Sequence, residues 1–232
     1  QERSDVAAVQ PKIRALRDKH AFEYAGAAGG YVDRWGYPFC RGRIFDAVET
    51  DTGQYDDIAE VFWASGAALF IRRQVYMAVG GLDPRFFAHQ EEIDLCWRLH
   101  SRGWRIAVAP SSTVFHLGGG SLDMKNPRKV YLNFRNNLLM LYKNLPETAL
   151  KPTMRIRALL DFLSAMVFLL TGKFRHMQAV VRARRDFRRM RPDFSASRSE
   201  NLLLGSIPAP MKPYSIVFQF YIRRRKIFSR LP

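Results

Sequence analysis

The chain has 232 residues, of which 47% are apolar and 25% charged, a composition that indicates a folded core and excludes an intrinsically disordered chain. Its two cysteines, Cys40 and Cys96, are too few for a disulfide framework and too far apart for a metal knuckle, so two reduced thiols are expected. Residues 1–124 carry a net charge of −2 and residues 125–232 one of +18, which predicts an anionic partner, either nucleic acid or acidic lipid.

The first sixty residues predict a strand followed by an irregular region. The apolar run over residues 6–9 is typical of a buried strand, and Pro11 is expected to end it. Residues 21–60 are rich in glycine, aromatic and acidic residues, which predicts short hairpins. The glycines of AGAAGG (25–30) are expected to form tight turns, because this segment lacks the Lys-Ser/Thr ending of a phosphate-binding loop and leads into no helix.

Helices and strands alternate from residue 61 to residue 117. Glycines follow both predicted helices, where they act as C-terminal stops. Such alternation predicts the α/β class. The expected elements are an interrupted strand over 61–73, a helix over 73–81, a helix over 91–103, and two short strands around Pro110 within 104–117.

The sequence beyond residue 125 is basic and helical. Residues 125–146 predict one helix. Residues 158–170 form a dense apolar stretch that is shorter than the roughly 20 residues needed to span a bilayer. Residues 173–191 predict an arginine-rich helix, and Pro, Ser and Gly predict a linker near 192–213 before a basic C-terminus.

Three segments in fixed order carry the strongest functional signal: SGAALFIRR (65–73), VGGLDPRFFAHQEEIDLCWRL (79–99) and VFHLGGGS (114–121). Together they resemble the acceptor-side half of inverting family-2 glycosyltransferases of the GT-A fold, especially the rhamnosyltransferase-like branch. The resemblance covers about residues 1–145. It implies an α/β fold in which the C-terminal half of a GT-A domain is followed by a basic helical appendage.

This resemblance also predicts how the chain is organised. Residues 1–146 are interpreted as the acceptor-side half of the catalytic domain, residues 147–191 as a basic amphipathic helical segment, and residues 192–232 as a linker and basic tail. The family's nucleotide-binding half ends at an Asp-x-Asp motif, which finds no match here. That half is therefore expected to be missing, and the fragment alone to be inactive.

The acidic pair Glu91-Glu92 is the candidate for catalysis. Inverting glycosyl transfer needs a carboxylate to take the proton of the acceptor hydroxyl. Helical geometry puts Glu92 on the same face as Leu95 and Cys96, fixed at the helix start. The resemblance places the base at Glu92, with Glu91 as the next candidate. The alternative is an acidic first turn that is merely favoured by the helix dipole.

The resemblance assigns a metal role to His116. A histidine at this place joins the Asp-x-Asp motif in holding a divalent cation, Mn²⁺ or Mg²⁺, on the donor diphosphate. A neutral imidazole suits Mn²⁺ better than Mg²⁺, which prefers oxygen. A structural histidine remains the alternative.

The remaining candidates are small or cationic residues that would contact substrate. Small residues leave room for a hexose or let the backbone approach a phosphate, and an arginine can bind a diphosphate through two hydrogen bonds. A simple strand kink at residues 65–67 and a solvated basic helix face are the alternatives. The substrate-binding candidates are Ser65, Gly66, Ala67, Gly118, Gly119 and Arg135.

The predicted function is transfer of a sugar from a nucleotide-diphosphate donor to a glycan or lipid-linked acceptor, with inversion, in cell-surface polysaccharide synthesis. The basic second half predicts a cytoplasmic protein that lies peripherally on the anionic inner face of the membrane. Alternatively, residues 158–191 form a helical hairpin packed on the catalytic domain, or the chain is a non-catalytic membrane-surface or scaffold module. Nucleic acid is not expected, because the basic segments lack interleaved stacking aromatics.

Overall fold

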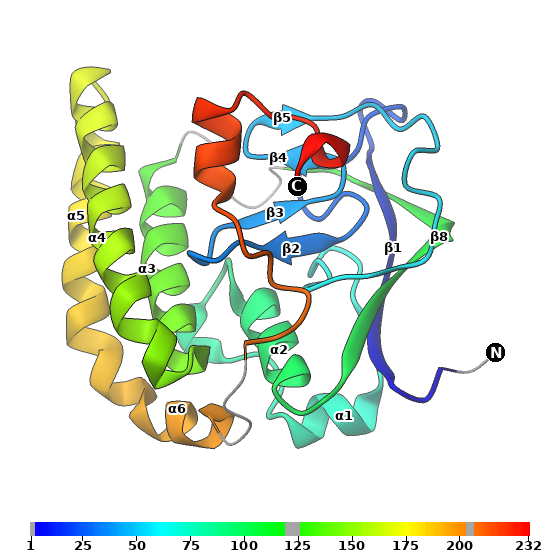
Figure 1. Cartoon of the computed structure of the whole chain (residues 1–232), viewed down its shortest axis with the longest axis horizontal. Coiled ribbons are helices and arrows are strands. Elements are labelled where there is room, and N and C mark those ends of the chain that lie inside the picture. The colour runs from blue at the N-terminus through cyan, green and yellow to red at the C-terminus, as the bar shows by residue number, and fades with distance from the viewer. Residues whose placement is uncertain (1–2, 119–125, 203–206) are drawn as a thin grey trace. The chain divides into compact units, whose positions relative to one another are not determined.

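The computed structural model describes residues 3–118, 126–202 and 207–232 (Figure 1). The chain falls into two units. The first unit contains Gln1–Leu82, Leu95–Gly118 and Pro208–Pro232, and the second contains Asp83–Asp94 and Gly119–Ile207. The first unit holds the β-sheets and the second most of the helices, so the chain is mixed α/β, as predicted.

The longest strands of the first unit are β1 (Val6–Ala15) and β8 (Arg105–His116), which pair in parallel. The prediction that Pro11 ends the first strand is wrong, as is the prediction of two strands around Pro110. The register shifts between the Pro11–Ala109 and Lys12–Thr113 pairs, and this irregularity lets both strands continue past a residue that cannot donate a ladder hydrogen bond. The sheet order is β6-β8-β1-β7, with β6 (Ala59–Glu60) and β7 (Phe70–Ile71) antiparallel to their neighbours.

A second, antiparallel sheet confirms the predicted hairpins in residues 21–60. The turn before it confirms the role expected of the AGAAGG glycines, since Gly26 and Gly29 have φ values of +109° and +104°, where side chains are disfavoured. The strands of this sheet are β2 (Gly30–Val32), β3 (Pro38–Cys40), β4 (Arg43–Ile44) and β5 (Ala47–Val48).

The C-terminal segment packs on this hairpin sheet rather than forming a free tail. The Asp33 carboxylate accepts a 2.8 Å hydrogen bond from the backbone nitrogen of Ile216, and the Phe228 ring stacks on Tyr31 with 5.3 Å between centroids. The segment contains a π-helical turn, η4 (Phe218–Ile222), and a 3-10 turn, η5 (Phe228–Arg230). Residues 208–232 are thus folded into the first unit.

Helix α2 (Glu91–His100) confirms the predicted helix over 91–103, and α1 (Arg73–Ala78) confirms the one over 73–81. Residues 95–99 of α2 are buried in the first unit, where the ring of Trp97 meets that of Phe62 edge-on at 5.3 Å. This burial fixes the helix whose first residues carry the acidic pair.

The second unit is built around α3 (Pro127–Asn144), α4 (Glu147–Leu170) and α5 (Phe174–Met190). The predicted helices over 125–146 and 173–191 are confirmed, and the apolar stretch over 158–170 is the end of the longer α4. A 3-10 turn, η2 (Arg191–Phe194), leads to α6 (Ser195–Asn201), so the linker expected near 192–213 is helical over 195–201. Arg198 on α6 is buried and donates to the Leu145 carbonyl at 2.7 Å, an anchor that polar composition alone did not reveal.

Candidate active site

The loop before α2 holds an unusual backbone conformation. It opens with η1 (Pro84–Phe86), where the side chain of Asp83 accepts a hydrogen bond from the backbone nitrogen of Arg85. Phe87, His89 and Gln90 then have φ values of +69°, +69° and +73°, a left-handed conformation that costs about 1–3 kcal/mol for a residue other than glycine. Such strain persists only where surrounding contacts impose it.

Helix α3 supplies those contacts. The Asn136 side-chain nitrogen donates to the carbonyl oxygens of Phe86, Ala88 and His89 at 2.8–2.9 Å, its two hydrogens being shared among three acceptors. Arg135 donates to the Phe86 carbonyl at 2.9 Å, and Asn137 donates to the Gln90 side chain at 3.1 Å. The Arg-Asn-Asn run at 135–137 therefore positions the loop. Three consecutive polar residues on a helix that packs against the rest of the unit are the sequence signal for this role.

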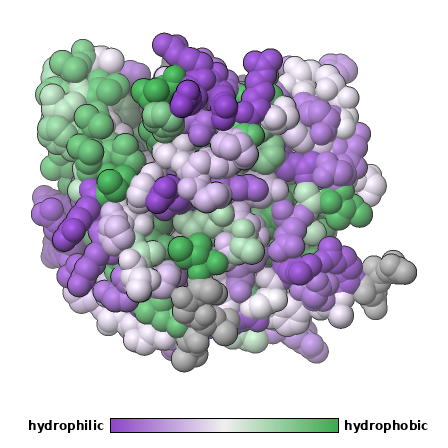
Figure 2. All heavy atoms as spheres, in the orientation of Figure 1, coloured by the Kyte–Doolittle hydropathy of each residue, from purple (hydrophilic) through white to green (hydrophobic). Residues whose placement is uncertain are grey.

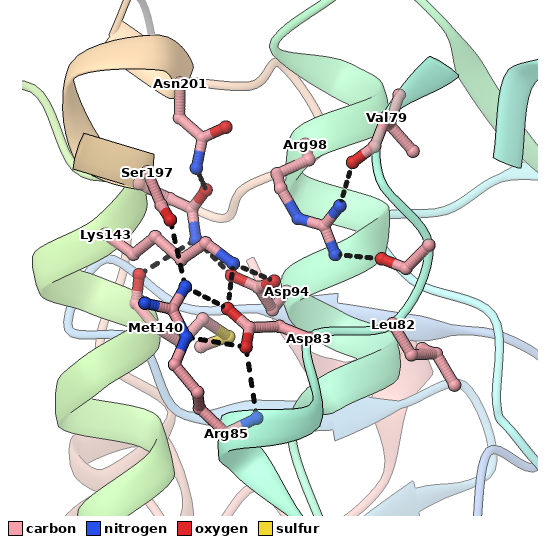
Figure 3. A network of polar contacts seen from close by, with 12 residues as sticks. Val79, Leu82, Asp83, Arg85, Asp94, Arg98, Met140, Lys143, Ser197 and Asn201 are labelled. Atoms are coloured by element: carbon pink, nitrogen blue, oxygen red, sulfur yellow. Dashed lines mark hydrogen bonds and ion pairs between the residues drawn. The ribbon is translucent and has the colours of Figure 1, made fainter. Parts of the chain in front are cut away.

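A buried ion-pair network holds both ends of the same segment. The Nζ atom of Lys143 lies 2.8 Å from a carboxylate oxygen of Asp83 and 2.8 Å from one of Asp94 (Figure 3). Asn144 donates to the second oxygen of Asp94 at 2.8 Å. Burial would raise the pKa of Asp83, but the hydrogen bonds from Arg85 and Lys143 outweigh it and lower that pKa below its usual range. One lysine on α3 thus ties the residue that starts the loop to the first turn of α2.

The acidic pair itself lies on the first turn of α2, half-buried. In the described part of the chain, one carboxylate oxygen of Glu91 and one of Glu92 are buried without a hydrogen-bond partner. Burial, together with the charge of Glu91, raises the pKa of Glu92 to about 7, and burial also raises the pKa of Glu91. A carboxyl group with this pKa can exchange a proton near neutral pH, as a general base must.

His89 adds a third unsatisfied group beside the acids in sequence. Its Nε2 atom is buried and has no hydrogen-bond partner within the ranges that the structure describes. Burial and the charge of Lys129 lower its pKa, so the neutral imidazole is favoured. Buried polar atoms are normally paired, so three orphaned atoms within four residues mark a place where a ligand would complete the hydrogen bonding. Sequence reasoning missed His89.

The small residues at 65–67 belong to the first unit. The Ser65 backbone nitrogen donates to the Gln10 side chain at 2.8 Å, and the Ser65 hydroxyl accepts from the Ala67 nitrogen at 3.2 Å. A Cβ atom on Gly26 would lie 2.4 Å from the Cβ atom of Ser65, so a residue with a side chain at position 26 would clash with Ser65. Gly66, which lies between Ser65 and Ala67 in the sequence, is exposed. Their predicted contact with a donor sugar remains a prediction.

His116 lies at the end of β8, also in the first unit. Its Nδ1 atom is buried, lacks a hydrogen-bond partner among the described residues, and lies 4.0 Å from a carboxylate oxygen of Glu23. A Cβ on Gly118 would lie 2.2 Å from the same carboxylate. An imidazole nitrogen and a carboxylate suit Mn²⁺, so this pair fits part of a cation site, although the described residues hold no group of three potential ligands. Gly119 lies outside the described residues.

The candidates are therefore divided between the units. Glu91, Glu92 and Arg135 are in the second unit, together with the network that holds the acidic pair. The first unit contains the small residues and the histidine: Ser65, Gly66, Ala67, His116 and Gly118.

The mixed α/β architecture is that of a GT-A glycosyltransferase domain. The chain belongs to glycosyltransferase family 2: the family described as "Glycosyltransferase like family 2" matches residues 2–138, more than half of the chain. The predicted family is thereby confirmed.

Individual relatives match over shorter segments. N-acetylglucosaminyl-diphospho-decaprenol L-rhamnosyltransferase of Mycobacterium tuberculosis is 43% identical over 56 residues, which are 24% of this chain and 18% of that protein. Rhamnosyltransferase WbbL of Escherichia coli is 34% identical over 56 residues, 24% of this chain and 21% of the relative. O-antigen biosynthesis protein RfbC of Myxococcus xanthus is 26% identical over 115 residues, 50% of this chain and 9% of the relative. The chain thus matches less than a quarter of the length of each.

Proposed function

We propose that this protein is an inverting glycosyltransferase that transfers a sugar from a nucleotide-diphosphate donor to a lipid-linked glycan in cell-surface polysaccharide synthesis. In this proposal Glu92 is the catalytic base. The observation that carries the proposal is the half-buried Glu92 with an unsatisfied carboxylate oxygen and a pKa raised to about 7. The relatives named as rhamnosyltransferases favour rhamnose as the sugar. The name of the mycobacterial relative favours an acceptor on a diphospho-lipid.

In the proposed step Glu92 takes the proton from an acceptor hydroxyl. The acceptor oxygen forms a bond to the anomeric carbon of the donor as the bond from that carbon to the diphosphate breaks, which inverts the configuration. The network of Asp83, Asp94 and Lys143 keeps the base in place, and Asn136 holds the strained loop before it. A divalent cation held in part by His116 would neutralise charge on the leaving diphosphate.

The test is the Glu92→Gln variant of the full-length protein, assayed with nucleotide-sugar and a lipid-linked acceptor. Transfer should fall by about 10²–10⁴-fold, while nucleotide affinity stays unchanged, because only proton removal is lost. Glu200→Gln, an exposed acid on α6, is the charge-matched control and should retain full activity. Retention of more than half the activity by Glu92→Gln would exclude this base, and Glu91 would then be tested in the same way.

We further propose that the protein attaches peripherally to an anionic membrane. None of the described helices is long and apolar enough to cross a bilayer. Figure 2 shows apolar side chains gathered over the upper ends of α4 and α5. This surface, the α4–α5 apolar surface, is formed by the exposed residues Leu159, Phe162, Leu163, Val167, Leu169, Leu170, Phe174 and Val181. Basic residues that stand among its members in sequence, such as Lys173 and Arg175, would meet acidic headgroups.

A further inference from the structure

A pocket of about 550 Å³ opens in the second unit, between α3 and α5. Its α3 wall carries residues at helical spacing, Arg128, Tyr131 and Arg135, and its α5 wall carries Arg175 and Arg182 in the same way. The exposed side chain of Phe87, from the strained loop before Glu91, also lines the pocket. The remaining lining residues are Pro127, Leu132, Gln178 and Ala179.

The pocket concentrates positive charge. Four of its lining residues are arginines, and none is an acid. Arg182 lies 3.5 Å from the carboxylate of Asp186, whereas Arg128, Arg135 and Arg175 have no ion pair within the part of the chain that the structure describes. Guanidinium groups present paired N–H donors that match phosphate oxygens. The pocket is therefore suited to a ligand with several negative charges.

Aromatic rings hold the guanidinium groups in position. Arg135 and Arg182 both lie over the Tyr131 ring, 5.3 and 5.2 Å from its centroid. Arg128 lies 5.1 Å from the centre of the Phe87 ring. Arg135 is 91% buried and is further fixed by its bond to the Phe86 carbonyl. A preorganised set of cations loses little side-chain entropy when an anion binds.

We infer that this arginine pocket binds the diphosphate group of a lipid-linked acceptor, an inference that rests on the proposed transferase function. Two features distinguish a lipid from a nucleotide as the source of the diphosphate. Phe174 and Val181, exposed members of the α4–α5 apolar surface, directly adjoin the pocket residues Arg175 and Arg182 in sequence, so an isoprenoid chain leaving the pocket would meet apolar side chains. The pocket is also lined by Phe87, in the loop that leads to the acidic pair, where the first sugar of the acceptor would have to lie.

Direct binding to the full-length protein tests this inference without relying on transfer. Isothermal titration with farnesyl diphosphate, inorganic pyrophosphate, a nucleoside diphosphate and farnesol separates the lipid, diphosphate and nucleotide contributions. The double variant Arg175→Gln/Arg182→Gln removes two exposed pocket cations. Its control, Arg188→Gln/Arg189→Gln, removes two exposed cations of the same helix outside the pocket. Thermal unfolding checks that both variants fold.

Farnesyl diphosphate should bind more tightly than pyrophosphate, and farnesol should not bind. The pocket variant should bind farnesyl diphosphate and pyrophosphate at least tenfold more weakly, whereas the control should bind them as the parent does. Equal losses of diphosphate affinity in both variants, or no loss in the pocket variant, would contradict diphosphate binding in the pocket. A nucleoside diphosphate that loses affinity in the pocket variant as strongly as farnesyl diphosphate would overturn the lipid source. The proposed function is tested separately by the transfer assay. If the full-length protein transfers no sugar, the titrations still decide whether the pocket binds diphosphate.

Discussion

The side-chain nitrogen of Asn136 donates a 2.8 Å hydrogen bond to the carbonyl oxygen of His89, a residue held at a φ of +69°. Asn136 is fully buried on α3, and His89 lies two residues before the acidic pair of α2. One amide on a packed helix thus sets the path of the backbone that presents Glu91 and Glu92. The geometry of the candidate base depends on a residue that need not touch substrate.

Asn136→Ala should therefore reduce both stability and activity. The change leaves the part-buried carbonyl groups of Ala88 and His89 without the Asn136 donor, whereas that of Phe86 keeps the hydrogen bond from Arg135. The expected cost is about 1–3 kcal/mol in the free energy of unfolding. Release of the strained loop should also slow transfer by about 100-fold, since small displacements of a catalytic group cost that much. Urea unfolding and steady-state assays measure the two effects.

The control for this variant is Ser164→Ala, since the Ser164 hydroxyl donates to the Leu160 carbonyl of its own helix. It should leave both measurements close to the parent values. A fully active Asn136→Ala protein would show that the loop keeps its conformation without this amide.

Glu92 should make activity and stability respond oppositely to pH. Activity should rise with pH through about 7, because only the carboxylate accepts a proton. Between the ordinary pKa of 4.5 and about 7, the folded protein holds a proton that the unfolded chain releases, so this group's contribution makes stability fall as pH rises. At pH 8, Glu92→Gln should be more stable than the parent by about 1–3 kcal/mol, although its transfer activity should be greatly reduced.

Chemical denaturation at pH 5 and pH 8 checks this prediction. The stabilisation by Glu92→Gln should be present at pH 8 and largely absent at pH 5, where the parent carboxyl is already protonated in the folded state. Equal stabilisation at both pH values would mean that shape rather than charge distinguishes the two side chains.

Elements with clear periodicity could be predicted from the sequence, whereas their tertiary partners could not. The pattern over 125–146 predicted α3, but local spacing does not reveal that Lys143 lies between Asp83 and Asp94, more than forty residues away. The prediction that Pro11 ends a strand failed because it treated the strand in isolation. The parallel partner β8 supplies an irregular register that accommodates the proline.

The acidic residues of the site could be predicted from the sequence, but the burial and backbone conformation around them could not. Two adjacent acids at a helix start are visible in the sequence, but the raised pKa of Glu92 arises from burial, which depends on the whole unit. The orphaned His89 and the positive φ values of the loop had no local signal, because non-glycine residues rarely adopt that conformation. The arginine pocket requires α3 and α5 to face one another, a relation that helix periodicity alone does not specify.

His116→Ala in the full-length protein should weaken the Mn²⁺ dependence of nucleotide binding. The motivation is the buried, unpartnered Nδ1 atom, 4.0 Å from the Glu23 carboxylate. Titrations of nucleotide with and without Mn²⁺ measure the effect, and His20→Ala, an exposed histidine of the same unit, is the control. An unchanged Mn²⁺ dependence would assign His116 a structural role.

The α4–α5 apolar surface should attach the protein to vesicles that contain acidic lipid. Burial of a leucine or phenylalanine side chain is worth about 1.5–3 kcal/mol, and each basic residue near an anionic surface adds about 1 kcal/mol. The double variant Leu170→Ser/Phe174→Ser removes two side chains that are 80% and 57% exposed. It should lower binding by about 10–100-fold, allowing for incomplete burial in the headgroup region.

Co-sedimentation with phosphatidylcholine vesicles, with and without phosphatidylglycerol and at low and high salt, measures this attachment. Binding should be stronger with the acidic lipid and partly reversed by salt, because headgroup attraction decays over a Debye length. Ile58→Ser is the matched control, since Ile58 is 73% exposed but belongs to the first unit. If this control loses as much binding as Leu170→Ser/Phe174→Ser, or if binding ignores both lipid charge and salt, the α4–α5 apolar surface is not a peripheral membrane contact.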